Sequence, residues 1–140
     1  MENFAAYGHA ITAIVIYAMV AQVLNALTGI AKGSNDMVPG APYIADYTDK
    51  NYRLDRAYMN SVEMLVFTGA LIFSAILASA NPIWTNIFAS VVLLLRLVMI
   101  VIYMRGIGEG YGGIRTMMAI GQSICNLGLA VITVFAVLTA

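Results

Sequence analysis

The chain has 140 residues, of which 61% are apolar and only 10% are charged, and its seven basic and seven acidic residues balance to a net charge of zero. A soluble domain usually carries about a quarter charged residues, so this content is too low for a water-soluble globule. The composition also excludes a disordered chain, a nucleic-acid-binding protein with a basic face and a disulfide-stapled secreted scaffold, since the chain has a single cysteine. We therefore expect an integral membrane protein with one domain.

The first uncharged stretch predicts a transmembrane helix. Between His9 and Lys32 lie 22 residues without a charge, enough at about 1.5 Å per residue to cross a hydrocarbon core of about 30 Å. No basic segment precedes this stretch, and it is longer than the apolar core of a signal sequence, so we expect it to be retained.

Three further helices follow. The 32 uncharged residues 64–95 are too many for one span, and they are interrupted by Asn81-Pro82, a usual cap and first residue of a new helix. Residues 116–140 carry no charge and supply the last span. The expected fold is an all-α bundle of four transmembrane helices in one domain, residues 1–140, with helices at about 8–31, 54–79, 82–104 and 115–139.

Two polar loops, at about 33–50 and 105–113, lie on the same side of a four-span protein. Six of the seven basic residues fall toward that side: Lys32, Lys50, Arg53, Arg56, Arg105 and Arg115. The positive-inside rule then predicts that the loops are cytoplasmic and that both termini lie on the opposite side. If the source is a bacterium, the membrane is the inner membrane.

Three ionisable residues do not belong to the loops: Glu63, Arg96 and, at the helix edge, Arg56. Ionisable groups inside a membrane span are costly and are functional candidates by default. Glu63 lies 18 residues before Asn81 and Arg96 lies 15 after it, so in antiparallel helices their depths differ by only about 4.5 Å. The two side chains could form one pair, either as a structural ion pair between helices or as part of a site.

Other polar residues cluster near the loop side of the same helices. Residues 53, 56, 60 and 63 fall within a sector of about 80° on their helix, and Arg96 and Tyr103, seven apart, share a face of the next. With Arg115, these residues predict a polar pocket with an excess of cations, which suits an anionic, hydrogen-bonding ligand. No metal site is expected, because neither His9 nor Cys125 has a second ligand at metal-type spacing.

The stretch Tyr52 to Glu63, YRLDRAYMNSVE, resembles the signature of the MAPEG family, membrane-associated proteins in eicosanoid and glutathione metabolism. That signature has arginine followed by alanine, then asparagine four residues after the arginine and glutamate three further on, here Arg56, Asn60 and Glu63. Arg96, followed seven residues later by Tyr103, and the Arg115-Thr116 pair continue the likeness.

The resemblance implies a homotrimer that holds glutathione between adjacent subunits near the cytosolic face. It implies that Arg53 and Arg56 bind the glutathione carboxylates, that Asn60 and Glu63 bind its backbone and amino group, and that Tyr103 adds a hydrogen bond. Arg115 would stabilise the thiolate as the catalytic residue. Supporting roles would fall to Arg96, Thr116 and Lys32.

The activity expected from this resemblance is that of a membrane glutathione transferase or peroxidase. Glutathione would be the co-substrate, and the second substrate a hydrophobic electrophile or a lipid hydroperoxide dissolved in the bilayer, with no metal and no nucleic acid involved. A non-catalytic accessory subunit of a larger membrane assembly stays open as an alternative. A small multidrug exporter also has four spans, but it would be expected to place its membrane carboxylate in the first helix, where this chain has none.

Overall fold

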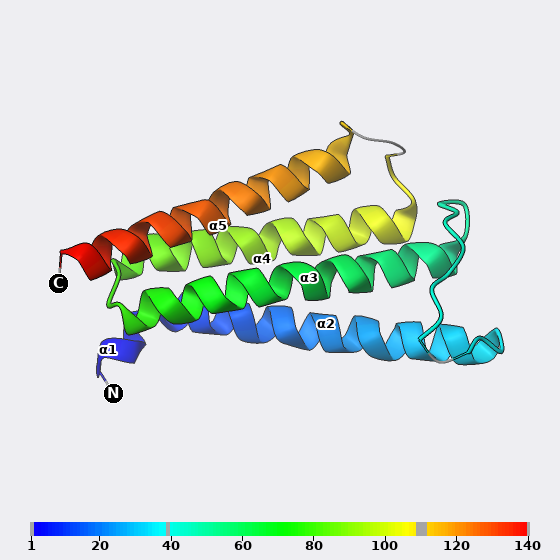
Figure 1. The fold of residues 1–140 in the computed structure, drawn as a ribbon, viewed down its shortest axis with the longest axis horizontal. Helices are drawn as coiled ribbons and strands as arrows, with labels where there is room; N and C mark the ends of the chain where they lie inside the picture. The colour runs from blue at the N-terminus through cyan, green and yellow to red at the C-terminus, as the bar shows by residue number, and fades with distance from the viewer. Residues whose placement is uncertain (1, 39, 109–111, 140) are drawn as a thin grey trace.

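The computed structural model describes residues 2–38, 40–108 and 112–139. Its elements are a short helix α1 (Glu2–Ala5) and four long helices, α2 (Gly8–Ser34), α3 (Lys50–Leu77), α4 (Pro82–Arg105) and α5 (Ile114–Leu138). The long helices lie side by side and alternate in direction, with both termini at one end and the loops before α3 and α5 at the other (Figure 1). All four are long and apolar enough to cross a membrane, so the predicted all-α, multi-pass membrane fold is confirmed.

Local signals in the sequence set three of the helix boundaries. Asn81 accepts from the backbone N–H of Ile83 at 3.0 Å, and Pro82 occupies the first turn of α4, as predicted. Asp49 accepts from the N–H of Asn51 at 2.8 Å and starts α3 at Lys50, one turn earlier than expected. At the end of α4, Gly106 takes a left-handed conformation with φ 66°, which glycine adopts without strain.

Small residues hold the bundle together at the end that contains the termini. The buried core there consists of Ala10, Ala13, Ile72, Ala89 and Leu129, and the alanines let the helix backbones approach closely. The helix α1, which the sequence did not predict, precedes a turn whose Tyr7 hydroxyl donates to the carbonyl of Ala80 in the α3–α4 hairpin.

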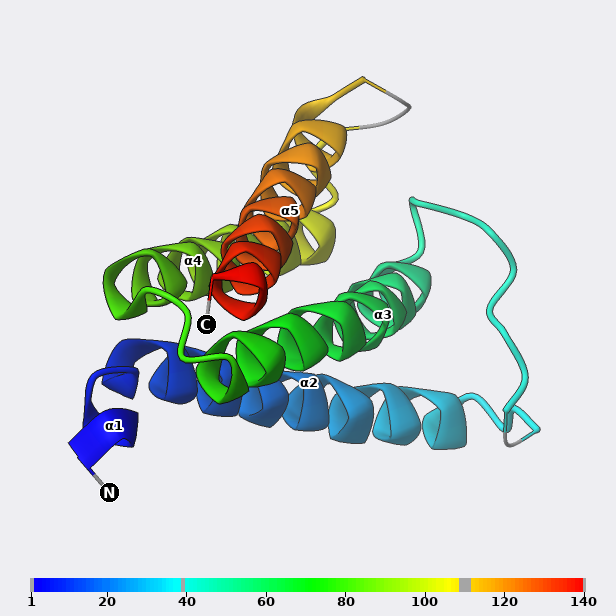
Figure 2. The same ribbon diagram turned by 60° about the vertical axis from the view of Figure 1, so that its left-hand side comes forward.

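The helices are arranged as two neighbouring pairs, α2 with α3 and α4 with α5 (Figure 2). The axis of α5 diverges from α4 toward its own N-terminus, at the loop end of the bundle (Figure 1). The loop between α2 and α3 spans residues 35–49 and lies at this same end. The second predicted loop includes residues 109–111, which lie outside the described residues.

Candidate functional site

A pocket of about 480 Å³ lies at the loop end between α3, α4 and α5. Its lining residues are Tyr47, Arg56, Asn60, Met99, Tyr103, Arg115, Thr116 and Ala119. Five of these residues were predicted from the sequence, and the structure brings all five together: Arg56, Asn60, Tyr103, Arg115 and Thr116. Helical spacing placed Arg56, Asn60 and Tyr103, whereas Thr116 came from the family resemblance.

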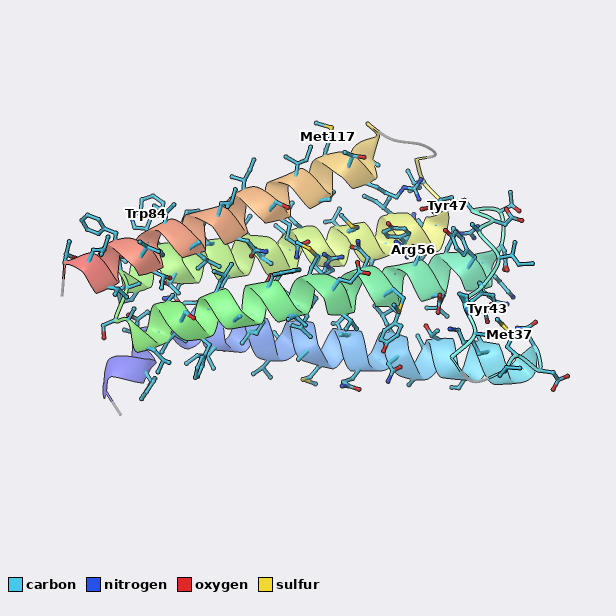
Figure 3. The ribbon with its side chains drawn as sticks, viewed as in Figure 1. Met37, Tyr43, Tyr47, Arg56, Trp84 and Met117 are labelled. Atoms are coloured by element: carbon cyan, nitrogen blue, oxygen red, sulfur yellow. The ribbon has the colours of Figure 1, made fainter. Side chains whose placement is uncertain are left out.

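Arg115 packs over two aromatic rings in this pocket. Its Cζ is 4.2 Å from the ring centre of Tyr47 and 5.4 Å from that of Tyr103, both within the range of a cation–π contact. Tyr47 belongs to the loop before α3, and Figure 3 shows it near Arg56 at the loop end of the bundle. Tyr47 was not predicted from the sequence, because periodicity carries no information about where a loop side chain points.

The first turn of α5 adds positive potential to the pocket. The helix begins at Ile114 behind a glycine cap that supplies no side-chain hydrogen bond, so its first N–H groups keep the partial positive charge of a helix N-terminus. Thr116 Oγ1 accepts from the N–H of Gly112 at 3.2 Å, which ties the preceding turn to the helix. Arg115 is therefore a fixed cation at the positive end of a helix.

The pocket carries an excess of positive charge. Arg56 and Arg115 both line it, and none of its lining residues is a carboxylate. Among the described residues the only ion pair joins Lys32 and Asp55, at 2.9 Å, so neither pocket arginine is neutralised by a carboxylate there. Walls of this kind suit an anion with hydrogen-bonding groups.

A third arginine lies behind the pocket wall. Arg96 is 1% exposed, and it donates from Nη1 to Asn60 Oδ1 and from Nη2 to Gln122 Oε1, each at 2.5 Å. Gln122 is also within 3.5 Å of the Tyr17 hydroxyl, which donates to the carbonyl of Ser61 at 3.1 Å. This network joins all four long helices, and its one charge is met by neutral oxygens.

The possible pair between Glu63 and Arg96 does not form within the chain. Glu63 is exposed on the outside of α3, while Asn60, three residues earlier, meets the guanidinium. Three helical residues correspond to a rotation of about 300°, which turns Glu63 about 60° away from the direction of Asn60. The matched depth was a sound inference, but depth does not fix direction, so the structural ion-pair interpretation is wrong here.

Two further predicted site residues make other contacts. Arg53 donates from Nη1 to the carbonyls of Tyr47 and Thr48, at 2.7 and 2.9 Å, and Lys32 pairs with Asp55. Neither is a pocket-lining residue. Gln122, which the sequence analysis also missed, had a visible signal, since it is a polar residue inside the uncharged stretch 116–140.

Within the part of the chain that the structure describes, no group of three or more His, Cys, Asp or Glu side chains could hold a metal ion. Asp46 is an acidic loop residue whose pKa is shifted. Hydrogen bonds from the Thr48 side chain and backbone hold the pKa of its carboxyl below the usual value of 3.8. This contact shapes the turn that carries Tyr47.

Comparison with known proteins agrees with this architecture. A sequence model of the MAPEG family matches residues 4–135, which is nearly the whole chain. No curated protein matches the chain in sequence. The matched range includes the four long helices up to Phe135 and every pocket residue. The chain therefore belongs to the MAPEG family, whose members are membrane proteins of eicosanoid and glutathione metabolism.

Proposed function

We propose that this protein is a membrane glutathione transferase or peroxidase that binds glutathione in the pocket at the loop end of the bundle. The observation that carries the proposal is the pairing of two cations, Arg56 and Arg115, with the hydrogen-bonding groups of Asn60 and Tyr103 in a pocket without a lining carboxylate. Glutathione is an anion rich in amide and carboxylate groups, and these walls match its chemistry.

Arg115 is the proposed catalytic residue. A free thiol titrates at about 8.5, and a fixed guanidinium at a helix N-terminus favours the thiolate over the thiol. The released proton passes to water. The thiolate sulfur then bonds to an electrophilic carbon as the leaving group departs with the bonding electron pair. Alternatively, it bonds to the terminal oxygen of a hydroperoxide as the O–O bond breaks, which gives a sulfenic acid and an alkoxide that takes a proton from water. A second glutathione thiol then reacts with the sulfenic acid to give the disulfide and water.

The second substrate is proposed to reach the pocket from the lipid. Met99 and Ala119 give the pocket an apolar side, and outward-facing residues of α4 and α5 such as Leu94, Val101, Met117 and Ile120 are exposed. In a bilayer these exposed apolar faces lie among acyl chains, so a hydrophobic electrophile or lipid hydroperoxide can approach without crossing water.

We propose that the loop end faces the cytoplasm and the termini face the opposite side. Both pocket arginines, together with Lys32, Lys50, Arg53 and Arg105, lie at or near the loop end, and cytoplasmic ends of membrane proteins are enriched in basic residues. Glutathione is made in the cytosol, so this orientation would open the pocket to its source.

We further propose a homotrimer, because polar side chains face outward at membrane depth. Glu63 is exposed on α3, and Gln22 and Asn25 are exposed on α2. Ile14 of α2 packs against Gly69 of α3. Because the two helices are antiparallel, Gln22 and Glu63 both lie toward the loop end from this contact, and their depths in the membrane differ by only about 3 Å. In an assembly, the side-chain amides of Gln22 and Asn25 could donate to the Glu63 carboxylate of a second copy at the same depth, whereas lipid acyl chains offer no hydrogen-bond donor.

The experiment that tests the activity is a glutathione titration of the purified protein, followed by ultraviolet thiolate absorbance. The expected result is a saturable rise in thiolate absorbance that Arg115→Ala abolishes. Arg105→Ala is the matched control, since Arg105 is an exposed cation at the same end of the bundle and outside the pocket lining. Saturating glutathione without a binding signal in the wild type would refute the proposal.

Cysteine cross-linking tests the assembly. In a Cys125→Ala background, Gln22→Cys combined with Glu63→Cys is expected to give covalent dimers and trimers on oxidation. Ser90→Cys, at an exposed position of α4, serves as the control and is expected to give neither product. A protein that runs as a monomer in mild detergent and gives no cross-link would contradict the proposed trimer.

A further inference from the structure

The turn at residues 46–48 closes one side of the pocket through the ring of Tyr47. Tyr47 lines the pocket, and its ring centre lies 4.2 Å from Arg115 Cζ, while the ring centre of Tyr103 lies 5.4 Å from the same atom. Tyr52 also packs against the Tyr47 ring, with the ring centres 5.2 Å apart and the planes nearly at right angles. The Tyr47 ring is thus in contact with residues of two helices, α3 and α5.

The backbone on either side of Tyr47 is held by Arg53. The guanidinium donates to the carbonyls of Tyr47 and Thr48, and it packs over Gly106, where an added Cβ would lie 3.3 Å from Arg53 Cζ. Asp46 completes the turn by accepting from Thr48 through both the backbone N–H and the hydroxyl, at 2.8 Å. Arg53 therefore connects the loop before α3 to the end of α4.

We propose that Tyr47 is a positioning residue that holds the Arg115 guanidinium in place for an anionic ligand, and that Arg53 acts on the site through Tyr47. A guanidinium that packs over an aromatic face is restricted in orientation while its N–H groups stay free to donate to a bound anion. Because the Arg115 guanidinium is already ordered before the anion binds, less conformational entropy is lost on binding. The identity of the anion as glutathione rests on the proposed function, whereas the stacking does not.

The stacking can be tested without any ligand by the rate at which phenylglyoxal modifies each arginine, followed by peptide mass spectrometry. Tyr47→Ala is expected to raise the rate at Arg115 about fivefold, because one of its two aromatic covers is removed. Tyr47→Phe is expected to keep the wild-type rate, since it retains the ring. Arg53→Gln is expected to raise the Arg115 rate as well, because it releases the turn.

Tyr43→Ala is the matched control. Tyr43 belongs to the same loop, but its ring faces Lys32, with Nζ 5.6 Å from the ring centre, so the Arg115 rate should not change. The rate at exposed Arg105 reports general loosening of the protein. The proposal is overturned if Tyr47→Ala leaves the Arg115 rate unchanged, if Tyr43→Ala raises it equally, or if Arg105 accelerates by the same factor.

A second measurement connects the stacking to function. With glutathione as the ligand, Tyr47→Ala is expected to reduce thiolate formation at saturation, and Tyr47→Phe to restore it. If the loop had only a structural role, Tyr47→Ala would lower the amount of folded protein. The folded fraction would then form as much thiolate at saturation as Tyr47→Phe does. If the wild type binds no glutathione, the proposed function fails, and the modification rates still decide whether Tyr47 holds Arg115.

Discussion

Replacing Gln122 tests whether the buried charge of Arg96 contributes to anion affinity in the pocket. The Gln122 side chain is fully buried, and its Oε1 accepts from Arg96 Nη2 at 2.5 Å. Gln122→Leu keeps a similar volume and removes the acceptor. A hydrogen bond to a charged group contributes about 1.5–3 kcal/mol, so we expect a loss of about 2 kcal/mol in the free energy of unfolding.

Gln122→Glu separates stability from charge. A carboxylate at this position keeps the acceptor and forms an ion pair with Arg96, so we expect the free energy of unfolding to stay within about 1 kcal/mol of the wild type. The same change cancels the positive charge behind Asn60 and Met99, which line the pocket. Anion affinity should therefore fall even though the fold is retained.

The size of that fall follows from Coulomb's law. At a distance of about 10 Å and an effective dielectric constant of about 20, two unit charges interact by roughly 1.7 kcal/mol. Solvent in the open pocket reduces this to about 1 kcal/mol, or about fivefold in the dissociation constant of glutathione. Gln122→Leu should lack this specific effect, because it leaves the charge of Arg96 in place.

The assays are unfolding in mixed detergent micelles with increasing SDS, followed by circular dichroism, and a glutathione titration of each variant. Ser123→Leu is the control, since Ser123 is the next residue of α5 and is exposed; we expect a change within about 0.5 kcal/mol. A Gln122→Leu protein as stable as the wild type would refute the role of the hydrogen bond. A Gln122→Glu protein with unchanged glutathione affinity would refute the electrostatic role of Arg96.

Two further predictions concern packing and the loop. A Cβ added at Gly128 would lie 2.7 Å from the Phe88 ring. After the better helix propensity of alanine is taken into account, Gly128→Ala should therefore lower the free energy of unfolding by about 1 kcal/mol, as measured by SDS unfolding. The loss should disappear in a Phe88→Leu background, and an equal loss in both would contradict the close contact. For Asp46, whose folded-state pKa is lowered, the stabilising contact is present above the usual carboxyl pKa and is lost as the pH falls through the lower folded value. NMR titration of the carboxyl carbon should show an upward shift of its pKa in Thr48→Val, and no shift would rule out the Thr48 hydroxyl as its cause.

The sequence predicted what regular helices determine. Helical spacing brought Arg56 and Asn60 together on α3. Arg115 was expected at the same loop end, the resemblance added Thr116 beside it, and all four residues line one pocket. Such positions are predictable because an α-helix turns by a fixed angle and rises by a fixed distance per residue.

The sequence could not predict contacts that depend on side-chain direction between elements. Arg53 shares the helix face of Arg56, yet its long side chain reaches back to the carbonyls of the preceding loop. Tyr47 lies in that loop, whose path no periodicity describes. Counting depth placed Glu63 and Arg96 at one level, but the choice of Asn60 over Glu63 depends on how α3 is rotated against α4, which only packing decides.

That rotation determines the charge of the pocket. Had Glu63 met Arg96, the two charges would have cancelled inside the bundle, and the pocket would have only Arg56 and Arg115 to attract an anion. Because Asn60 and Gln122 are neutral acceptors, they satisfy the guanidinium without cancelling its charge, and a third cation remains behind the wall. The carboxylate of Glu63 faces outward instead, where the proposed second copy would meet it. The arrangement thus stabilises a buried arginine through hydrogen bonds and keeps its electrostatic effect for the ligand.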